Sequence, residues 1–217
     1  MNLIYKFEKK DLLRYTSHLD LQRLVCRALR RAQLPVEYTQ GFHPLPVLNF
    51  AQALAVGASS QAEYMQVRIA DVHAEDTISA INAVLPQGLR IIDAFEKREG
   101  TPSLMAAVAA SRWSVSASEM EMDALQMLMQ ADQLWVERQG KGGLRKLDIR
   151  PGILDISRGV GAVQLLLRTG SALNIRPMDV YNAAGLSTLG RTVHRIELYA
   201  QEEELFVALE DYFRDTF

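Results

Sequence analysis

The chain has 217 residues, of which 48% are hydrophobic and 23% charged, and its formal net charge is -2. This length allows one or two compact domains with a buried core, and the near-neutral total excludes a protein that binds nucleic acid through overall positive charge. The charge is nevertheless uneven: eight basic residues face four acidic ones in residues 1–50, whereas six acidic residues face one basic residue in residues 201–217.

Cysteine content and hydropathy predict a cytoplasmic protein with no membrane partner. The single cysteine, Cys26, rules out a disulfide within the chain and favours a reducing compartment. The first residues, MNLIYKFEKKD, lack the apolar core of a signal peptide, and no apolar run approaches a membrane span. The four histidines have no ligand-like spacing, so we expect no metal and no cofactor.

The first half predicts an alternating order of strands and helices. Hydrophobic periodicity and turn residues place these elements as a strand in 2–15, a helix from Ser17 to Pro35, short strands in 36–38 and 47–56, a strand in 64–70, a helix in 75–85 and a strand in 89–95. Composition places a domain boundary at 97–103, which gives domains 1–99 and 104–217.

The second half repeats this order. The predicted elements are strands in 112–116, 134–137, 144–149, 163–168 and 192–199, helices in 119–130 and 177–184, an acidic helix in 203–212, and an insertion around 150–161. The expected fold is therefore α+β, with two tandem ferredoxin-like (split βαβ) domains whose sheets are antiparallel, the second with an insertion.

The predicted helix after Ser17 has a basic side. Ser17 and Asp20 have the spacing of a helix cap, and the helical period places the arginines opposite the apolar residues; these arginines are Arg23, Arg27, Arg30 and Arg31. A row of guanidinium groups suits phosphate oxygens. The alternative is a solvated helix face paired with nearby carboxylates.

Two further features of this region have both a structural and a functional interpretation. Ser17 and His18 at the helix start can form an anion pocket, or they can cap and pack. In Gly41–Pro44 (GFHP), Phe42 can stack on a base or lie in the core, and we favour the core. His43 is the preferred functional residue of the first half.

Basic residues of the second half form a weaker candidate patch. Strand alternation places Lys146, Asp148 and Arg150 on one face, and Arg176 precedes a helix start. Lys141 lies in a glycine-rich hairpin tip that can grip an extended nucleic acid. An exposed strand face and an ordinary mobile hairpin are the alternatives.

One stretch carries a family resemblance. The segment 14–64 closely resembles the start of the bacterial radical SAM-linked family, of unknown function: RYTSHLDLQRLVCRALRRAQLPVEYTQGFHPLPVLNFAQALAVGASSQAEY. The shorter motifs KLDIRP (146–151) and GSALNIRP (170–177) agree with it. The resemblance implies a radical SAM enzyme as partner and a role in RNA metabolism. With one cysteine, this chain lacks the three thiolates that hold a radical SAM cluster.

Three hypotheses follow. The first is a non-catalytic RNA-binding or substrate-presenting companion of a radical SAM enzyme, with a basic groove between two ferredoxin-like domains. The second is a metal-independent endoribonuclease or RNA-modifying enzyme that uses His43 and His18. The third is a protein adaptor for the radical SAM enzyme. No recognisable catalytic constellation supports an enzyme, so we favour the first.

Overall fold

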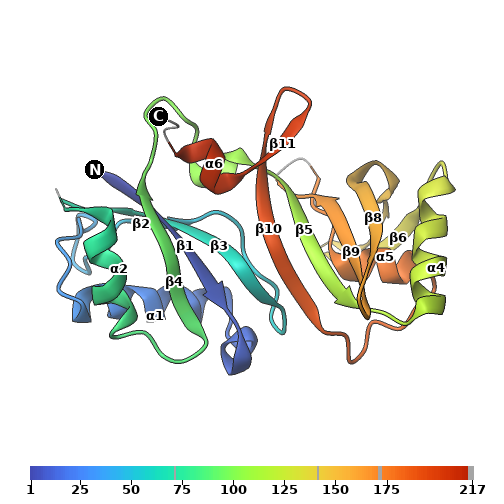
Figure 1. Ribbon diagram of the computed structural model, residues 1–217, viewed down its shortest axis with the longest axis horizontal. Helices are drawn as coiled ribbons and strands as arrows, with labels where there is room; N and C mark the ends of the chain where they lie inside the picture. The colour runs from blue at the N-terminus through green and yellow to red at the C-terminus, as the bar shows by residue number, and fades with distance from the viewer. Residues whose placement is uncertain (71, 141, 171–172, 215–217) are drawn as a thin grey trace. The chain divides into compact units, whose positions relative to one another are not determined.

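The computed structural model describes residues 1–70, 72–140, 142–170 and 173–214, and its fold is α+β with a large, mostly antiparallel sheet (Figure 1). The chain divides into two compact units. Unit 1 comprises Met1–Val108 and Glu197–Phe217, and unit 2 comprises Ala109–Ile196. The sequence places all of 104–217 in a second domain, whereas here the last segment groups with the first.

Unit 1 is built from two separate stretches of chain. Its elements are β1 (Asn2–Lys9), the 3-10 turn Asp11–Tyr15, α1 (His18–Arg31), β2 (Leu48–Phe50), β3 (Ser59–Arg68), α2 (Ala74–Asn82), β4 (Leu89–Glu96), α3 (Leu104–Ala107), the later part of β10 (Val193–Glu202), β11 (Leu205–Ala208) and α6 (Leu209–Phe213). Its strands are ordered β4-β1-β3-β10, with β2 paired to β3 and β11 to β10. β1 is antiparallel to both β3 and β4.

Side chains alternate across β1, so both faces of the unit 1 sheet are covered. Leu3, Tyr5 and Phe7 pack in one cluster with buried residues of α1 and α2. Ile4 points the other way, into a second cluster that includes Leu104 of α3 and buried residues of α6. The two helices that follow β1 and β3 therefore lie on one face, and the C-terminal segment helps to cover the other.

Unit 2 is one continuous stretch of chain. Its elements are β5 (Val108–Ser116), α4 (Glu119–Met127), the 3-10 turn Leu128–Gln130, β6 (Trp135–Gly140), β7 (Gly143–Asp148), the 3-10 turn Arg150–Gly152, β8 (Ile153–Gly159), β9 (Ala162–Arg168), α5 (Pro177–Ala183) and the start of β10. The strand order is β10-β5-β9-β8, while β6 and β7 form a separate hairpin. The stretch around 150–161, where an insertion was expected, contains β8 of the large sheet, whereas the hairpin before it lies outside that sheet.

Several boundaries differ from expectation around α1 and β2. The helix ends at Arg31, before Pro35, because Gln33 adopts a left-handed conformation (φ 54°). In 36–38, Val36 and Tyr38 form isolated bridges to Ile69 and Pro46 respectively, and of the strand expected in 47–56 only Leu48–Phe50 forms a strand. The acidic helix expected in 203–212 is replaced by β11 and the short α6.

Candidate functional site

The start of α1 is fixed by Ser17. Its Oγ accepts a hydrogen bond from the backbone N–H of Asp20 at 3.2 Å and donates one to Asp20 Oδ2 at 2.7 Å. These contacts satisfy an otherwise unpaired amide of the first turn, which is the usual role of a serine N-cap. Ser17 therefore has a structural use here, as the capping interpretation predicted.

The two sides of α1 are as different as its sequence predicts. Leu21, Val25 and Leu29 are buried in the unit 1 core. The opposite side exposes a row of four arginines, the arginine ridge, which consists of Arg23, Arg27, Arg30 and Arg31. The helical period confines these residues to an arc of about 100°.

Carboxylates neutralise little of this ridge. Arg23 lies 3.6 Å from Asp20, and both side chains are about 60% exposed, so water screens that pair strongly. Within the described parts of the chain, Arg27, Arg30 and Arg31 make no ion pair. Burial raises the pKa of the nearby Cys26 thiol, against the opposing effect of the neighbouring arginines, which fits a packed and unreactive cysteine.

The GFHP loop (Gly41–Pro44) is the tip of a small hairpin beside the ridge. Thr39 donates its backbone N–H to Leu45 O at 2.8 Å, and Leu45 donates its own to Thr39 Oγ1 at 3.1 Å. Arg30 attaches this hairpin to α1 by donating to Pro44 O at 2.8 Å, and its guanidinium also lies 5.7 Å from the Tyr38 ring centroid. One arginine of the ridge therefore holds the loop in place.

Phe42 lies outside the core, contrary to the expectation that it is buried. Its side chain is 102% exposed, and His43 beside it is also exposed. The hydrogen bonds between Thr39 and Leu45 close the hairpin below the tip, which leaves Phe42 projecting from it. An aromatic ring presented to solvent next to cationic groups is a surface suited to binding.

His18 and His43 lie at opposite ends of α1. His18 begins the helix, half-buried, with its ring centroid 5.1 Å from that of Phe50. His43 adjoins Pro44, which contacts Arg30, twelve residues further along α1. Twelve residues of helix span about 18 Å, so the geometry does not support a shared proton-transfer site.

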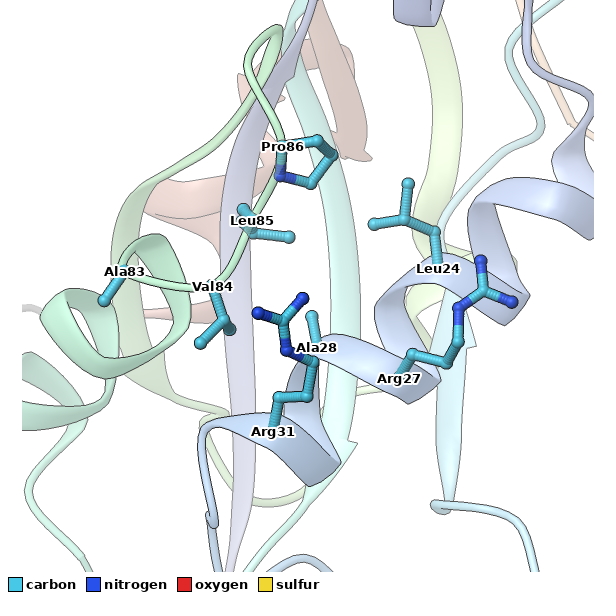
Figure 2. Close-up of a pocket in the computed structure, with 8 residues that line it drawn as sticks. All are labelled: Leu24, Arg27, Ala28, Arg31, Ala83, Val84, Leu85 and Pro86. Carbon is cyan, nitrogen blue, oxygen red and sulfur yellow. The ribbon is translucent and has the colours of Figure 1, made fainter.

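A pocket of about 450 Å³ opens beside the ridge (Figure 2). Residues of α1 line one side and the chain that ends α2 lines the other; the lining residues are Leu24, Arg27, Ala28, Arg31, Ala83, Val84, Leu85 and Pro86. Figure 2 shows the guanidinium group of Arg31 facing this largely apolar wall, whereas that of Arg27 points away from it. Sequence inspection missed the pocket, because nothing in the pattern pairs 83–86 with the arginines.

The KLDIRP segment (146–151) makes hydrogen bonds that stabilise the fold of unit 2. Asp148 Oδ1 accepts from the backbone N–H groups of Leu134 and Arg150, at 2.9 and 3.0 Å. The Arg150 guanidinium donates to three carbonyls, those of Met129, Ala131 and Ile153, at 2.9 to 3.0 Å. The Arg150 guanidinium is therefore occupied by backbone hydrogen bonds. The expected strand face of Lys146, Asp148 and Arg150 does not form, because the strand ends at Asp148.

The other candidates of unit 2 occupy separate positions. Lys146 is exposed and pairs with Glu137 in the β6–β7 register. Arg176 is exposed at the start of α5, and its backbone N–H donates to Asp179 Oδ2 at 2.7 Å. Lys141 lies outside the described residues.

In the described ranges no three or more His, Cys, Asp or Glu side chains are grouped so as to hold a metal ion. No helix among those residues is long and apolar enough to cross a membrane.

Comparison with known proteins gives a family and little else. A family model described as "Uncharacterized protein conserved in bacteria (DUF2344)" matches residues 2–177. No curated protein matches the sequence. A chain in the crystal structure of a Cbf5-Nop10-Gar1 complex is similar over 93% of this chain, with a TM-score of 0.45 and 8% identity. The present chain spans 50% of that chain, and a likeness this weak carries no inference.

Proposed function

The chain belongs to this family of uncharacterized bacterial proteins, and we propose that it binds single-stranded RNA through the arginine ridge and the GFHP loop without cleaving it. The observation that carries the proposal is the fully exposed Phe42, in a loop that Arg30 attaches to a helix whose last three arginines make no ion pair in the described chain. Guanidinium groups bind phosphate oxygens, and an exposed aromatic ring stacks on an unpaired base.

The two parts of this surface have different roles in the proposal. Arg27 and Arg31 project from a rigid helix next to the pocket of Figure 2 and contact phosphates. Arg30 fixes the loop through Pro44, so Phe42 is presented without ordering a mobile segment at the moment of binding. The ridge from Arg23 to Arg31 covers about 12 Å of helix, enough for a short stretch of backbone.

Single strands are favoured over duplexes because of Phe42. A paired base offers its faces to its neighbours in the stack, whereas an unpaired base can lie on an aromatic ring. Lys146 and Arg176 are both exposed, and we propose them as phosphate contacts of unit 2 by itself. Arg150 is left out because three carbonyls occupy its guanidinium.

A salt series tests the ridge. We expect the double variant Arg27→Ala/Arg31→Ala to bind a labelled single-stranded RNA more weakly than wild type. The slope of log affinity against log salt should fall by about 1.4, since each lost phosphate contact on a single strand contributes about 0.7. The matched control Lys10→Ala/Arg90→Ala removes the same charge from unit 1; Arg90 points away from α1, because its neighbours Leu89 and Ile91 point into the helix-facing core.

Equal slopes for wild type, ridge variant and control would remove the ridge from the proposal. The same experiment addresses catalysis. Intact RNA after long incubation is expected with wild type and with His43→Ala alike. Cleavage that disappears in His43→Ala would instead establish an enzyme.

At the level of the fold, we propose that each unit is a ferredoxin-like domain. The strand orders β4-β1-β3-β2 and β10-β5-β9-β8, each with two intervening helices, support this, because a split βαβ unit pairs its strands in that order. An experimental structure with other strand neighbours in either unit would overturn it.

A radical SAM enzyme remains the proposed partner on the strength of the sequence resemblance. Leu12, Tyr15 and Leu19, which are 83%, 56% and 52% exposed, support a protein-binding surface near the start of α1. Co-purification with such an enzyme should be lost in Leu12→Asp but retained in Val160→Asp, a matched change at an exposed valine of unit 2. Equal recovery with both variants would exclude this surface, and no recovery with wild type would exclude the partner.

A further inference from the structure

A second pocket, of about 350 Å³, lies at the opposite end of α1 from the GFHP loop. Its walls come from the first turns of α1, from β2 and the residues after it, and from α3; the lining residues are His18, Gln22, Leu48, Asn49, Phe50, Ala51, Gln52, Ala53 and Met105. All of these residues belong to unit 1. The proposed function makes no use of this pocket.

Three amide side chains line this pocket without a protein partner. Gln22, Asn49 and Gln52 make no side-chain hydrogen bond to any described residue. Each offers both a donor pair and a carbonyl acceptor, which is the combination that the edge of a nucleobase requires. Asn and Gln form paired hydrogen bonds with adenine in particular.

Two aromatic rings form a corner of the same pocket. The rings of His18 and Phe50 meet at 75° with centroids 5.1 Å apart, and Phe50 also packs at 6.1 Å on the core residue Phe7. The corner is therefore anchored to the unit 1 core. A flat base can contact one ring by its face and the other by its edge.

We propose that this pocket binds one unstacked nucleobase, with adenine preferred, of a single-stranded RNA whose backbone follows the arginine ridge; the inference rests on the proposed function. The position of the pocket along α1 supports this proposal. The chain from Pro44 to Phe50 runs back along α1, from Arg30 at one end to His18 at the other. One strand about 18 Å long can thus contact both the loop and the pocket.

Abasic scanning tests the pocket separately from the ridge. A labelled oligoadenylate and a set of copies with one abasic nucleotide at successive positions are titrated against wild type. One position should weaken binding roughly 5- to 150-fold, the range of a lost base-stacking contact. In the variant Gln22→Ala/Asn49→Ala, the loss of affinity caused by the abasic nucleotide should be smaller. The tighter binding of oligoadenylate than of oligouridylate, which we expect for wild type, should disappear in this variant. Gln133→Ala, an exposed amide of unit 2, should behave as wild type.

The outcomes separate the two proposals. Salt-dependent binding that is equally strong for every abasic copy, or a preference unchanged in the double variant, overturns the pocket and leaves the ridge. Absence of any salt-dependent binding overturns both. The melting temperature of the double variant should match that of wild type, because neither side-chain amide makes a hydrogen bond within the described chain. A lower melting temperature would mean that these side chains stabilise the fold, and it would contradict the proposal that the pocket binds a nucleobase.

Discussion

Replacement of Phe42 separates an effect on RNA binding from an effect on stability. The side chain is 102% exposed, so Phe42→Ala removes no buried apolar surface and leaves no cavity. The free energy of unfolding should therefore change by no more than about 0.5 kcal/mol. Loss of a stacked base should nevertheless cost about 1–3 kcal/mol of RNA binding, or roughly 5- to 150-fold in affinity.

Two measurements on the same preparations check this. Fluorescence anisotropy with single-stranded RNA reports affinity, and urea unfolding reports stability. Phe7→Ala provides the contrast in stability: Phe7 is 1% exposed, and its truncation should cost about 3–5 kcal/mol. Val160→Ala, an exposed apolar change in unit 2, controls for non-specific effects on binding. Unchanged affinity in Phe42→Ala, or a loss of stability comparable to Phe7→Ala, would refute the reasoning.

Two further predictions concern unit 2. Arg150→Ala should lower the free energy of unfolding, measured by urea titration, by about 2–4 kcal/mol, because three carbonyls lose a charged donor. The control Lys146→Ala should have almost no effect on this free energy. Equal effects of the two changes would contradict the structural role of Arg150. The hydrogen bond from Arg191 lowers the pKa of Glu121 to about 2, below its usual 4.5. The contact therefore stabilises the fold above pH 4.5, and this contribution to the free energy of unfolding is lost as the pH falls towards 2. Thermal unfolding across that range should depend less on pH in Glu121→Gln, and an unchanged pH dependence would exclude this carboxylate as the cause.

The sequence predicts the elements that depend on local signals. α1 begins at the cap that Ser17 and Asp20 indicate, and its arginines and leucines separate as the helical period requires. Its end is less visible, because Gln33 stops the helix by a left-handed conformation for which glycine or asparagine is the usual signal. The alternation of apolar and polar residues that predicts the central strands is also a local signal, and β4 and β9 lie close to their predicted ranges.

Features that depend on distant contacts were not predictable in this way. An aromatic residue next to glycine and proline resembles a core residue at a turn, and only the closure of the hairpin leaves Phe42 in solvent. Arg150 looks like one basic residue of a charged strand, but its three acceptors lie up to 21 positions away in the chain. The pockets on either flank of α1 likewise depend on segments that approach it only in the folded unit.

The division of the chain has a consequence for how the protein is made. Unit 2 is one uninterrupted stretch, whereas unit 1 needs Glu197 and the residues beyond it to complete its sheet and cover Ile4 and Tyr64. Unit 2 can therefore fold from a single stretch of chain, whereas residues 1–108 cannot complete their sheet until residues 197 onward have been made. A chain cut after Val108 would expose the apolar face that Leu209 and Phe213 cover, and its expression should require a chaperone or end in aggregation.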